Sequence, residues 1–174
     1  MHDDIDDETE QGGRSIVLLR HGIAEDAGPG QADEERALTA EGHARMKQIA
    51  RGLERAFPRA QVLYASPFLR AQQTAEWVSK AYRLRTVQTT DVLVPSGTPR
   101  QLAEFLKSHT ERRIILVGHE PNMTSNLLAL IGANDRAAVE FKKGGAACVR
   151  LTAGYGVLQW MMTPKLLAKL AAEG

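Results

Sequence analysis

Apolar positions along this chain form short continuous runs that alternate with longer stretches in which they recur every three or four residues. Short continuous runs are typical of buried strands, and the wider spacing is typical of helices with one face against a core. The runs predict strands at 15–19, 62–65, 84–89, 114–117, 146–151 and 157–161, the last two antiparallel to each other. The wider spacing predicts helices at 39–57, 66–81, 98–108, 123–131 and 164–172.

Strands that alternate with helices predict an α/β fold. The expected architecture has three layers, α/β/α, with a mostly parallel central sheet and one antiparallel edge strand. A length of 174 residues suits one domain, which we expect to span residues 14–174.

Three predicted helices begin with residues that are typical of N-caps. Thr39 is a candidate N-cap, and Thr98 has capping-box spacing to Gln101. Ser66 and Pro67 read as an N-cap followed by a proline in the first helical position.

The charge is distributed unevenly along the chain. Residues 1–14 hold six acids and one arginine, a net charge of −5, which leaves +6 on residues 15–174. A charged segment with almost no apolar residues cannot offset the entropy of ordering, so residues 1–13 are predicted to be a flexible acidic tail. A body charge of +6 favours a small anionic ligand, because no basic stripe interleaved with aromatic residues predicts nucleic-acid binding.

Composition excludes several further classes of protein. The single cysteine, Cys148, allows neither an intramolecular disulfide nor a cysteine zinc cluster. No apolar run approaches the roughly 20 residues of a membrane helix, and the first residues lack the pattern of a secretory signal. We therefore expect a cytoplasmic monomer without membrane contact and without a cofactor. We also expect no metal site, because His21 and His119 have no third ligand at a recognisable spacing.

Polar clusters follow three of the predicted strands at the point where each strand ends. The clusters are Arg20-His21-Gly22, Ser66 to Arg70, and His119-Glu120. Because ligands of open α/β sheets bind at the carboxyl ends of the strands, two histidines and two arginines should converge there. Glycines beside both histidines leave room for a ligand near the backbone.

Each of these residues also has a purely structural interpretation. A guanidinium at the end of a buried strand needs a partner, so Arg20 either binds an anion or pairs with Glu25 or Asp26. A lone histidine such as His21 or His119 is more often a satisfied core residue than a ligand.

Taken together, the clusters resemble the histidine phosphatase superfamily, also called phosphoglycerate mutase-like. Residues 20–22 (RHG) look like its signature, residues 66–74 (SPFLRAQQT) resemble its second block, and residues 117–121 (VGHEP) resemble its second-histidine block. Residues 38–42 are similar to the family's LT-x-x-G helix start, and the short chain is most similar to the SixA-type phosphohistidine phosphatases.

The resemblance implies a covalent mechanism without metal. His21 would attack a phosphoryl group and become phosphohistidine, which water would then hydrolyse. Arg20, Arg70, Gly22 and a protonated His119 would bind the phosphoryl oxygens, where charge gathers in the transition state.

One departure from the family concerns the acid that protonates the leaving group. Larger members carry a glutamate after the third strand, whereas residues 91–97 here contain only Asp91. Glu25, Asp26 and Glu120 remain candidate acids. An imidazole leaves more easily than an alkoxide, so the missing glutamate favours a phosphohistidine-containing protein as the substrate. The alternatives are small phosphomonoesters or nucleotides, and a non-catalytic phosphate-binding protein.

Overall fold

The computed structural model describes residues 13–134, 139–153 and 155–173. The predicted acidic tail, residues 1–13, lies outside the described residues except for Gly13, and it stays a prediction. Within the described parts of the chain, no helix is both long enough and apolar enough to cross a membrane.

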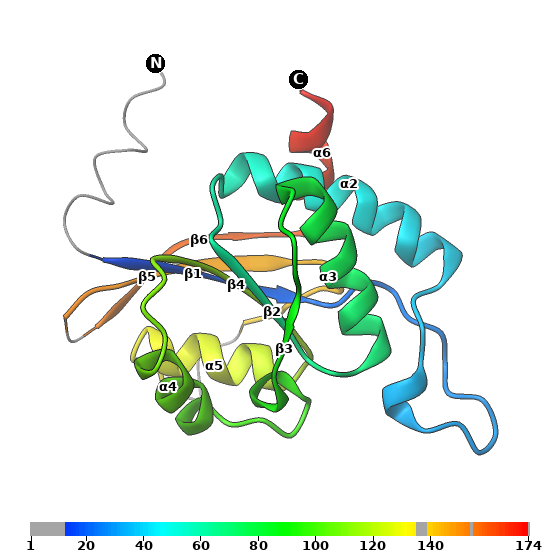
Figure 1. The fold of residues 1–174 in the computed structure, drawn as a ribbon, viewed down its shortest axis with the longest axis horizontal. Coiled ribbons are helices and arrows are strands. Elements are labelled where there is room, and N and C mark those ends of the chain that lie inside the picture. Colours follow the sequence, from blue (N-terminus) through cyan, green and yellow to red (C-terminus); the bar gives the residue numbers. More distant parts are fainter. Residues whose placement is uncertain (1–12, 135–138, 154, 174) are drawn as a thin grey trace.

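Six strands form one sheet in the order β3-β2-β4-β1-β5-β6 (Figure 1). Strands β3, β2, β4 and β1 are parallel neighbours, and β5 runs antiparallel to both β1 and β6. The bounds are β1 Arg14–Arg20, β2 Val62–Ala65, β3 Gln88–Thr89, β4 Arg113–Gly118, β5 Ala146–Leu151 and β6 Gly156–Met162.

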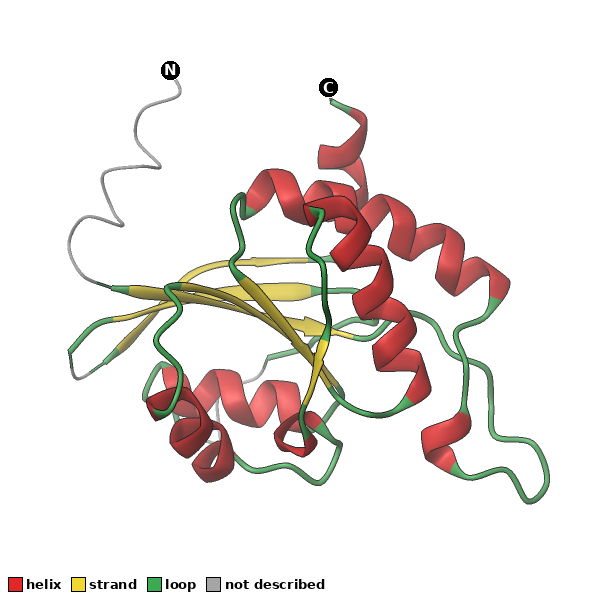
Figure 2. Ribbon diagram, viewed as in Figure 1, coloured by secondary structure: helices red, strands yellow, loops and turns green. Residues whose placement is uncertain are grey.

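Helices cover both faces of the sheet, which confirms the three-layer α/β/α fold (Figure 2). Helices α2, α3 and α6 lie on one face, and α4 and α5 lie on the other. The bounds are α2 Ala40–Ala56, α3 Leu69–Tyr82, α4 Pro99–Lys107, α5 Asn122–Leu130 and α6 Pro164–Ala172, with short 3-10 turns η1 Asp33–Glu35 and η2 Asp91–Leu93.

The continuous apolar runs are buried on both sides because alternate residues of a strand point to opposite faces. Val17 and Leu19 of β1 pack into the core under α2, α3 and α6. Ile16 and Leu18 pack into the core under α4 and α5. The central strands thus hold the two helical layers together and fix where their carboxyl ends lie.

Several predicted helix starts are confirmed. The Thr39 side chain accepts a hydrogen bond from Gly42 N at 2.9 Å, and Thr98 and Gln101 form a complete capping box. Ser66 is not an N-cap, because α3 begins three residues later with Phe68 as its N-cap.

Two features of the sheet differ in detail from the prediction. The strand predicted at 84–89 is reduced to Gln88 and Thr89, which pair with Tyr64 and Ala65 at the end of short β2. The single antiparallel strand, β5, lies one position in from the edge, since β6 covers it and runs in the direction of β1.

Candidate active site

The predicted motif residues meet where three neighbouring parallel strands end. His21 follows β1, Ser66 follows β2 and His119 follows β4, and β4 lies between the other two strands. The backbone stays paired beyond the strand ends, since His21 N donates to Gly118 O and Ser66 N donates to Val117 O, both at 3.0 Å. The His21 and His119 rings come to a centroid distance of 5.0 Å.

One ring nitrogen of His21 is bound to the backbone, and the other is directed toward Arg70. Its Nδ1 lies 2.7 Å from the carbonyl oxygen of Gly22, which can only accept, so Nδ1 carries the proton. A neutral imidazole then has its lone pair on Nε2, where Arg70 Nε donates at 3.3 Å. This is the arrangement that a histidine nucleophile requires.

His119 is fixed by Ser66. The Ser66 hydroxyl accepts from Phe68 N at 3.3 Å and lies 2.8 Å from His119 Nε2. Because the hydroxyl has no other acceptor among the described residues, it donates to Nε2, and the ring proton of neutral His119 then lies on Nδ1. That nitrogen is buried and has no hydrogen-bond partner in the described structure.

Arg70 projects from the first turn of α3 and is nearly buried. Its Nη1 donates to the backbone oxygen of Asp33 at 2.5 Å, and its Nη2 pairs with Asp33 Oδ2 at 2.8 Å. With the bond to His21, three of the five N–H groups of the guanidinium are in use. Two N–H groups remain without a partner among the described residues.

Arg20 does not pair with Glu25 or Asp26. Its Nη1 donates to the carbonyl oxygen of Phe141 at 2.6 Å, and its buried Nε has no partner in the described part of the chain. Burial lowers the pKa of Arg20, and the charges of Glu120 and Glu140 oppose that shift. The anion-binding interpretation of Arg20 is therefore the one that the geometry favours.

Both histidines of the site are neutral at physiological pH. Burial, more than the nearby arginines, lowers the pKa of His21 to about 3 and that of His119 to about 2. The expected protonated His119 is therefore not found. A neutral His119 can still donate one hydrogen bond through Nδ1, and a neutral His21 keeps its nucleophilic lone pair.

The candidate acids are either exposed or bound elsewhere. Glu25 and Asp26 are exposed on the segment that follows β1. Both carboxylate oxygens of Glu120 accept from Thr124, one from its backbone N–H and one from its hydroxyl, so this side chain caps α5. None of the three has a hydrogen bond to His21 or His119.

The carboxylate that does reach the site is Asp33, which the sequence analysis missed. Hydrogen bonds from Arg36 and Arg70 lower its pKa, so it is ionised at neutral pH and is unsuited to donate a proton. Asp33 lies in a charge-dense segment, and nothing in its spacing connects it with Arg70, which is 37 residues away. Asp33 binds Arg70 only because its segment folds back onto α3.

Gly22 serves packing and not the predicted phosphate contact. Its backbone N–H donates to Thr74 Oγ1 at 3.0 Å, so that N–H is not available to a ligand. A Cβ atom at Gly22 would lie 2.6 Å from Met46 Cγ. Thr74 also donates to the backbone oxygen of Arg70 at 2.7 Å and thereby joins α3 to the chain after β1.

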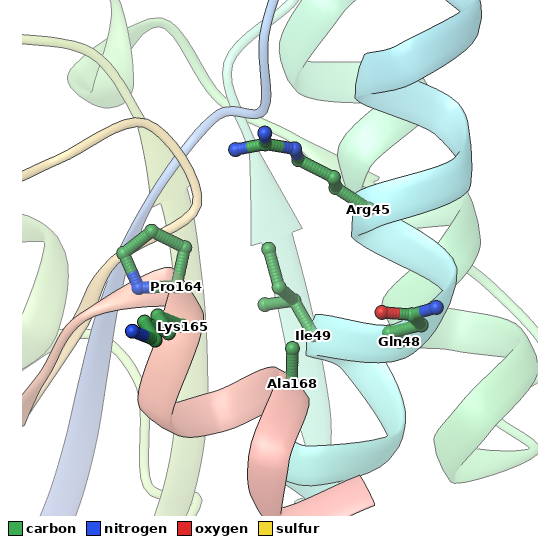
Figure 3. Close-up of a pocket in the computed structure, with 6 residues that line it drawn as sticks. All are labelled: Arg45, Gln48, Ile49, Pro164, Lys165 and Ala168. Atoms are coloured by element: carbon green, nitrogen blue, oxygen red, sulfur yellow. The ribbon is translucent and has the colours of Figure 1, made fainter.

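A pocket between α2 and α6 is separate from these residues (Figure 3). Its volume is about 310 Å³, and no motif residue lines it. Its lining residues are Arg45, Gln48, Ile49, Pro164, Lys165 and Ala168. In the described parts of the chain, no group of three or more His, Cys, Asp or Glu side chains is placed to hold a metal ion.

Comparison with known proteins shows which family this chain resembles. The model of the histidine phosphatase superfamily (branch 1) matches residues 16–94. An uncharacterized protein of Picosynechococcus is 29% identical over 138 residues, which cover 78% of this chain and 84% of that protein. Phosphohistidine phosphatase SixA of Escherichia coli is 27% identical over 154 residues, which cover 86% of this chain and 93% of SixA.

The solved structures agree with the sequence relatives. The structure of the protein histidine phosphatase SixA complexed with tungstate superposes with a TM-score of 0.78 and 26% identity, covering 88% of this chain and 99% of that one. The family match over residues 16–94 and the agreement over nearly the whole fold lead to one conclusion: the chain is similar to the histidine phosphatase superfamily, and in particular to its SixA-type members.

Proposed function

We propose that this protein removes the phosphoryl group from phosphohistidine on another protein, through a covalent intermediate on His21. The observation that carries the proposal is a set of N–H donors, on side chains close to His21, that have no acceptor among the described residues. They are Arg20 Nε, His119 Nδ1 and two N–H groups of Arg70. Buried donors without acceptors are costly, and a phosphoryl group offers three oxygens to accept from them.

The reaction proceeds in two displacements at phosphorus. In the first, the lone pair of His21 Nε2 forms a P–N bond while the P–N bond to the substrate imidazole breaks. In the second, a water oxygen attacks phosphorus, the bond to His21 breaks, and inorganic phosphate leaves. Arg20, Arg70 and His119 stabilise the equatorial oxygens, where negative charge is greatest in both transition states.

The substrate class follows from the absence of a placed proton donor among the described residues. An alkyl phosphate needs a proton at the bridging oxygen as the bond breaks, and positioned acid catalysis is typically worth roughly 10²–10⁴ in rate. The imidazole of phosphohistidine has a second nitrogen that can take a proton from solvent before the bond breaks. An ionised Asp33 and a Glu120 turned to Thr124 therefore disfavour esters more than they disfavour phosphohistidine.

The similar proteins support the same substrate. The relative from Escherichia coli is a phosphohistidine phosphatase. The SixA structure contains tungstate, a tetrahedral oxyanion of the same shape as phosphate.

The test compares leaving groups on the wild-type protein. Turnover of phosphoramidate, an aryl phosphate and an alkyl phosphate is measured together with release of phosphate from a phosphohistidine protein. We expect kcat/KM for the N–P substrates to exceed that for the alkyl phosphate by roughly 10²–10⁴. Equal kcat/KM across these leaving groups would show that an acid is placed after all and would favour small phosphomonoesters.

Trapping the intermediate tests the nucleophile separately. Rapid quenching with labelled substrate should leave phosphate on His21, and His21→Ala should lose both label and turnover while its melting temperature shows that it is folded. A label on His119 would contradict the assignment. Binding of phosphate without turnover of any substrate would show a non-catalytic phosphate-binding protein.

A further inference from the structure

A short turn beside the nucleophile carries two exposed lysines. We call residues 141–145 the lysine turn, after Lys142 and Lys143. The backbone N–H of Gly144 donates to the carbonyl oxygens of both Arg20 and His21, at 3.1 and 3.0 Å. Lys143 is thus one residue away from a direct backbone contact with the nucleophile.

The lysine turn is held from several directions. Phe141 is buried, and its carbonyl oxygen accepts from the Arg20 side chain at 2.6 Å. Gly145 N donates to Lys142 O at 2.7 Å, which closes the turn, and Gly145 O accepts from Arg20 N at 3.0 Å. These bonds fix the turn to the end of β1, so its position relative to His21 is built into the fold.

The helical layer behind the turn supports it as well. Gly144 has a φ of +79°, a conformation that suits glycine, and a Cβ there would lie 2.8 Å from Ile49 Cδ1. Ile49 and Pro164, which line the pocket of Figure 3, are both close to Gly144. The turn therefore rests on the wall of that pocket, with its lysines exposed to solvent.

The two lysine charges are not neutralised by the described part of the protein. Neither Lys142 nor Lys143 forms an ion pair or hydrogen bond through its side chain with a described residue. The positive charge of Lys143 contributes to the lowered pKa of His21, so its field reaches the nucleophile. The carboxylates Glu120 and Glu140 act on Arg20, where they oppose the lowering of its pKa by burial.

The segment after β1 has the opposite charge. It carries the exposed acids Glu25, Asp26, Glu34 and Glu35, and Asp33 joins it to Arg70. A partner with acidic side chains around its phosphohistidine would be repelled by this segment and attracted by the lysine turn. The two charged segments therefore favour one orientation of such a partner.

We infer that the lysine turn recognises carboxylates that flank the phosphohistidine of an acidic protein surface. The inference rests on the proposed function and deepens it, because it assigns the residues that select the protein substrate. A small phosphoramidate has no flanking group and gains nothing from these contacts.

The experiment uses two phosphohistidine peptides that differ only in flanking residues, one with Asp and Glu and one with Asn and Gln. For the wild-type protein at low salt we expect kcat/KM to be roughly 3- to 10-fold higher for the acidic peptide, as is typical of two exposed charge pairs. The preference should decrease as salt screens the charges. The double variant Lys142→Gln/Lys143→Gln should lose the preference.

Two further variants make the result specific. Lys47→Gln/Lys169→Gln removes the same charge from exposed lysines on α2 and α6, and it should keep the preference. Lys142→Glu/Lys143→Glu should instead prefer a peptide with lysine flanks. Melting temperatures establish that each variant is folded.

The outcomes separate this inference from the proposed function. Equal kcat/KM for the two peptides with the wild-type protein would overturn the role of the lysine turn and leave the proposed function standing. A preference that survives in Lys142→Gln/Lys143→Gln would also overturn it. Turnover of phosphoramidate without turnover of either peptide would overturn the proposed function itself.

Discussion

The carbonyl oxygen of Gly22 decides which nitrogen of His21 carries the free lone pair and so, in the proposed mechanism, which nitrogen attacks phosphorus. Because it holds the proton on Nδ1, the lone pair lies on Nε2, on the side of Arg70. The same logic applies to His119, where the Ser66 hydroxyl holds Nε2 and leaves the proton on Nδ1. Both imidazoles thus carry their proton on Nδ1, and in the proposed mechanism His21 offers the lone pair of Nε2 while His119 donates from Nδ1.

Asp33 orients Arg70, and its removal should weaken turnover. Asp33→Ala removes the carboxylate that holds Nη2, so the guanidinium gains freedom and kcat/KM should fall by roughly 10-fold, as expected for a partly exposed charge-assisted contact. Asp33→Asn keeps an acceptor and should lose less. The measurement is steady-state turnover of phosphoramidate with thermal melting of each variant.

Glu35→Ala is the matched control for Asp33. It removes an exposed carboxylate from the same 3-10 turn, and Glu35 has no side-chain contact with Arg70. We expect near wild-type turnover from it. If Asp33→Ala were instead faster than the wild-type protein, the carboxylate would be competing with the substrate for Arg70.

The sequence predicts the groups whose position depends on one strand end each. His21, Arg20, His119 and Arg70 follow predicted strands directly or within one helical turn, so topology alone brings them together. Asp33 and the lysine turn reach the site by folding back over it. No local pattern specifies such long-range contacts, and that is why both were missed.

Helix α3 is joined to the end of β1 by Thr74. Its hydroxyl accepts from Gly22 N and donates to Arg70 O, and the side chain is fully buried. Thr74→Val keeps the shape and removes both bonds, which leaves a buried N–H without a partner. The free energy of unfolding should therefore fall by about 1–3 kcal/mol, measured by urea denaturation.

The same substitution should affect catalysis through the helix. Because Arg70 and Gly22 lose their common link, we expect kcat of Thr74→Val to fall while KM changes less. Thr74→Ser keeps the hydroxyl and should restore most of both quantities. Unchanged stability in Thr74→Val would mean that another group satisfies Gly22 N.

Most elements follow from apolar periodicity and capping chemistry, and the exceptions have physical reasons. Ser66 has the chemistry of an N-cap, but its hydroxyl binds His119, and α3 starts later. The strand predicted at 84–89 keeps only its last two residues, which pair with Tyr64 and Ala65, and residues 84–87 do not pair with the first half of β2. At Ser66, a contact within the site thus overrides the local preference for a helix start.

The stability of the whole molecule depends on pH through its two buried histidines. In the unfolded chain a histidine titrates near pH 6.5, whereas the pKa of His21 is about 3 and that of His119 about 2 in the fold. Below pH 6.5 the unfolded state therefore binds more protons. The stabilising contribution is fully present above pH 6.5 and is lost as the pH falls toward the folded values.

We expect the free energy of unfolding to decrease by about 2–4 kcal/mol between pH 7 and pH 5. Carboxylates, which titrate near pH 4, stay mostly ionised in this range and contribute little. Urea denaturation at several pH values measures the slope. His21→Ala should show a shallower slope than the wild-type protein, and identical slopes would mean that His21 is not buried in its neutral form.

The pairing of β1 has a consequence for how the chain folds as it is synthesised. Its partners are β4 and β5. Ile16 can pair only after Ile114 has been synthesised, and Val17 only after Cys148. Contacts this distant along the chain slow folding, and the apolar β1 emerges from the ribosome about a hundred residues before either partner strand. During that interval the apolar residues of β1 lack the partner strands that bury them in the fold. Because His21 follows the same strand, its surroundings are complete only after β4 and β5 have been synthesised.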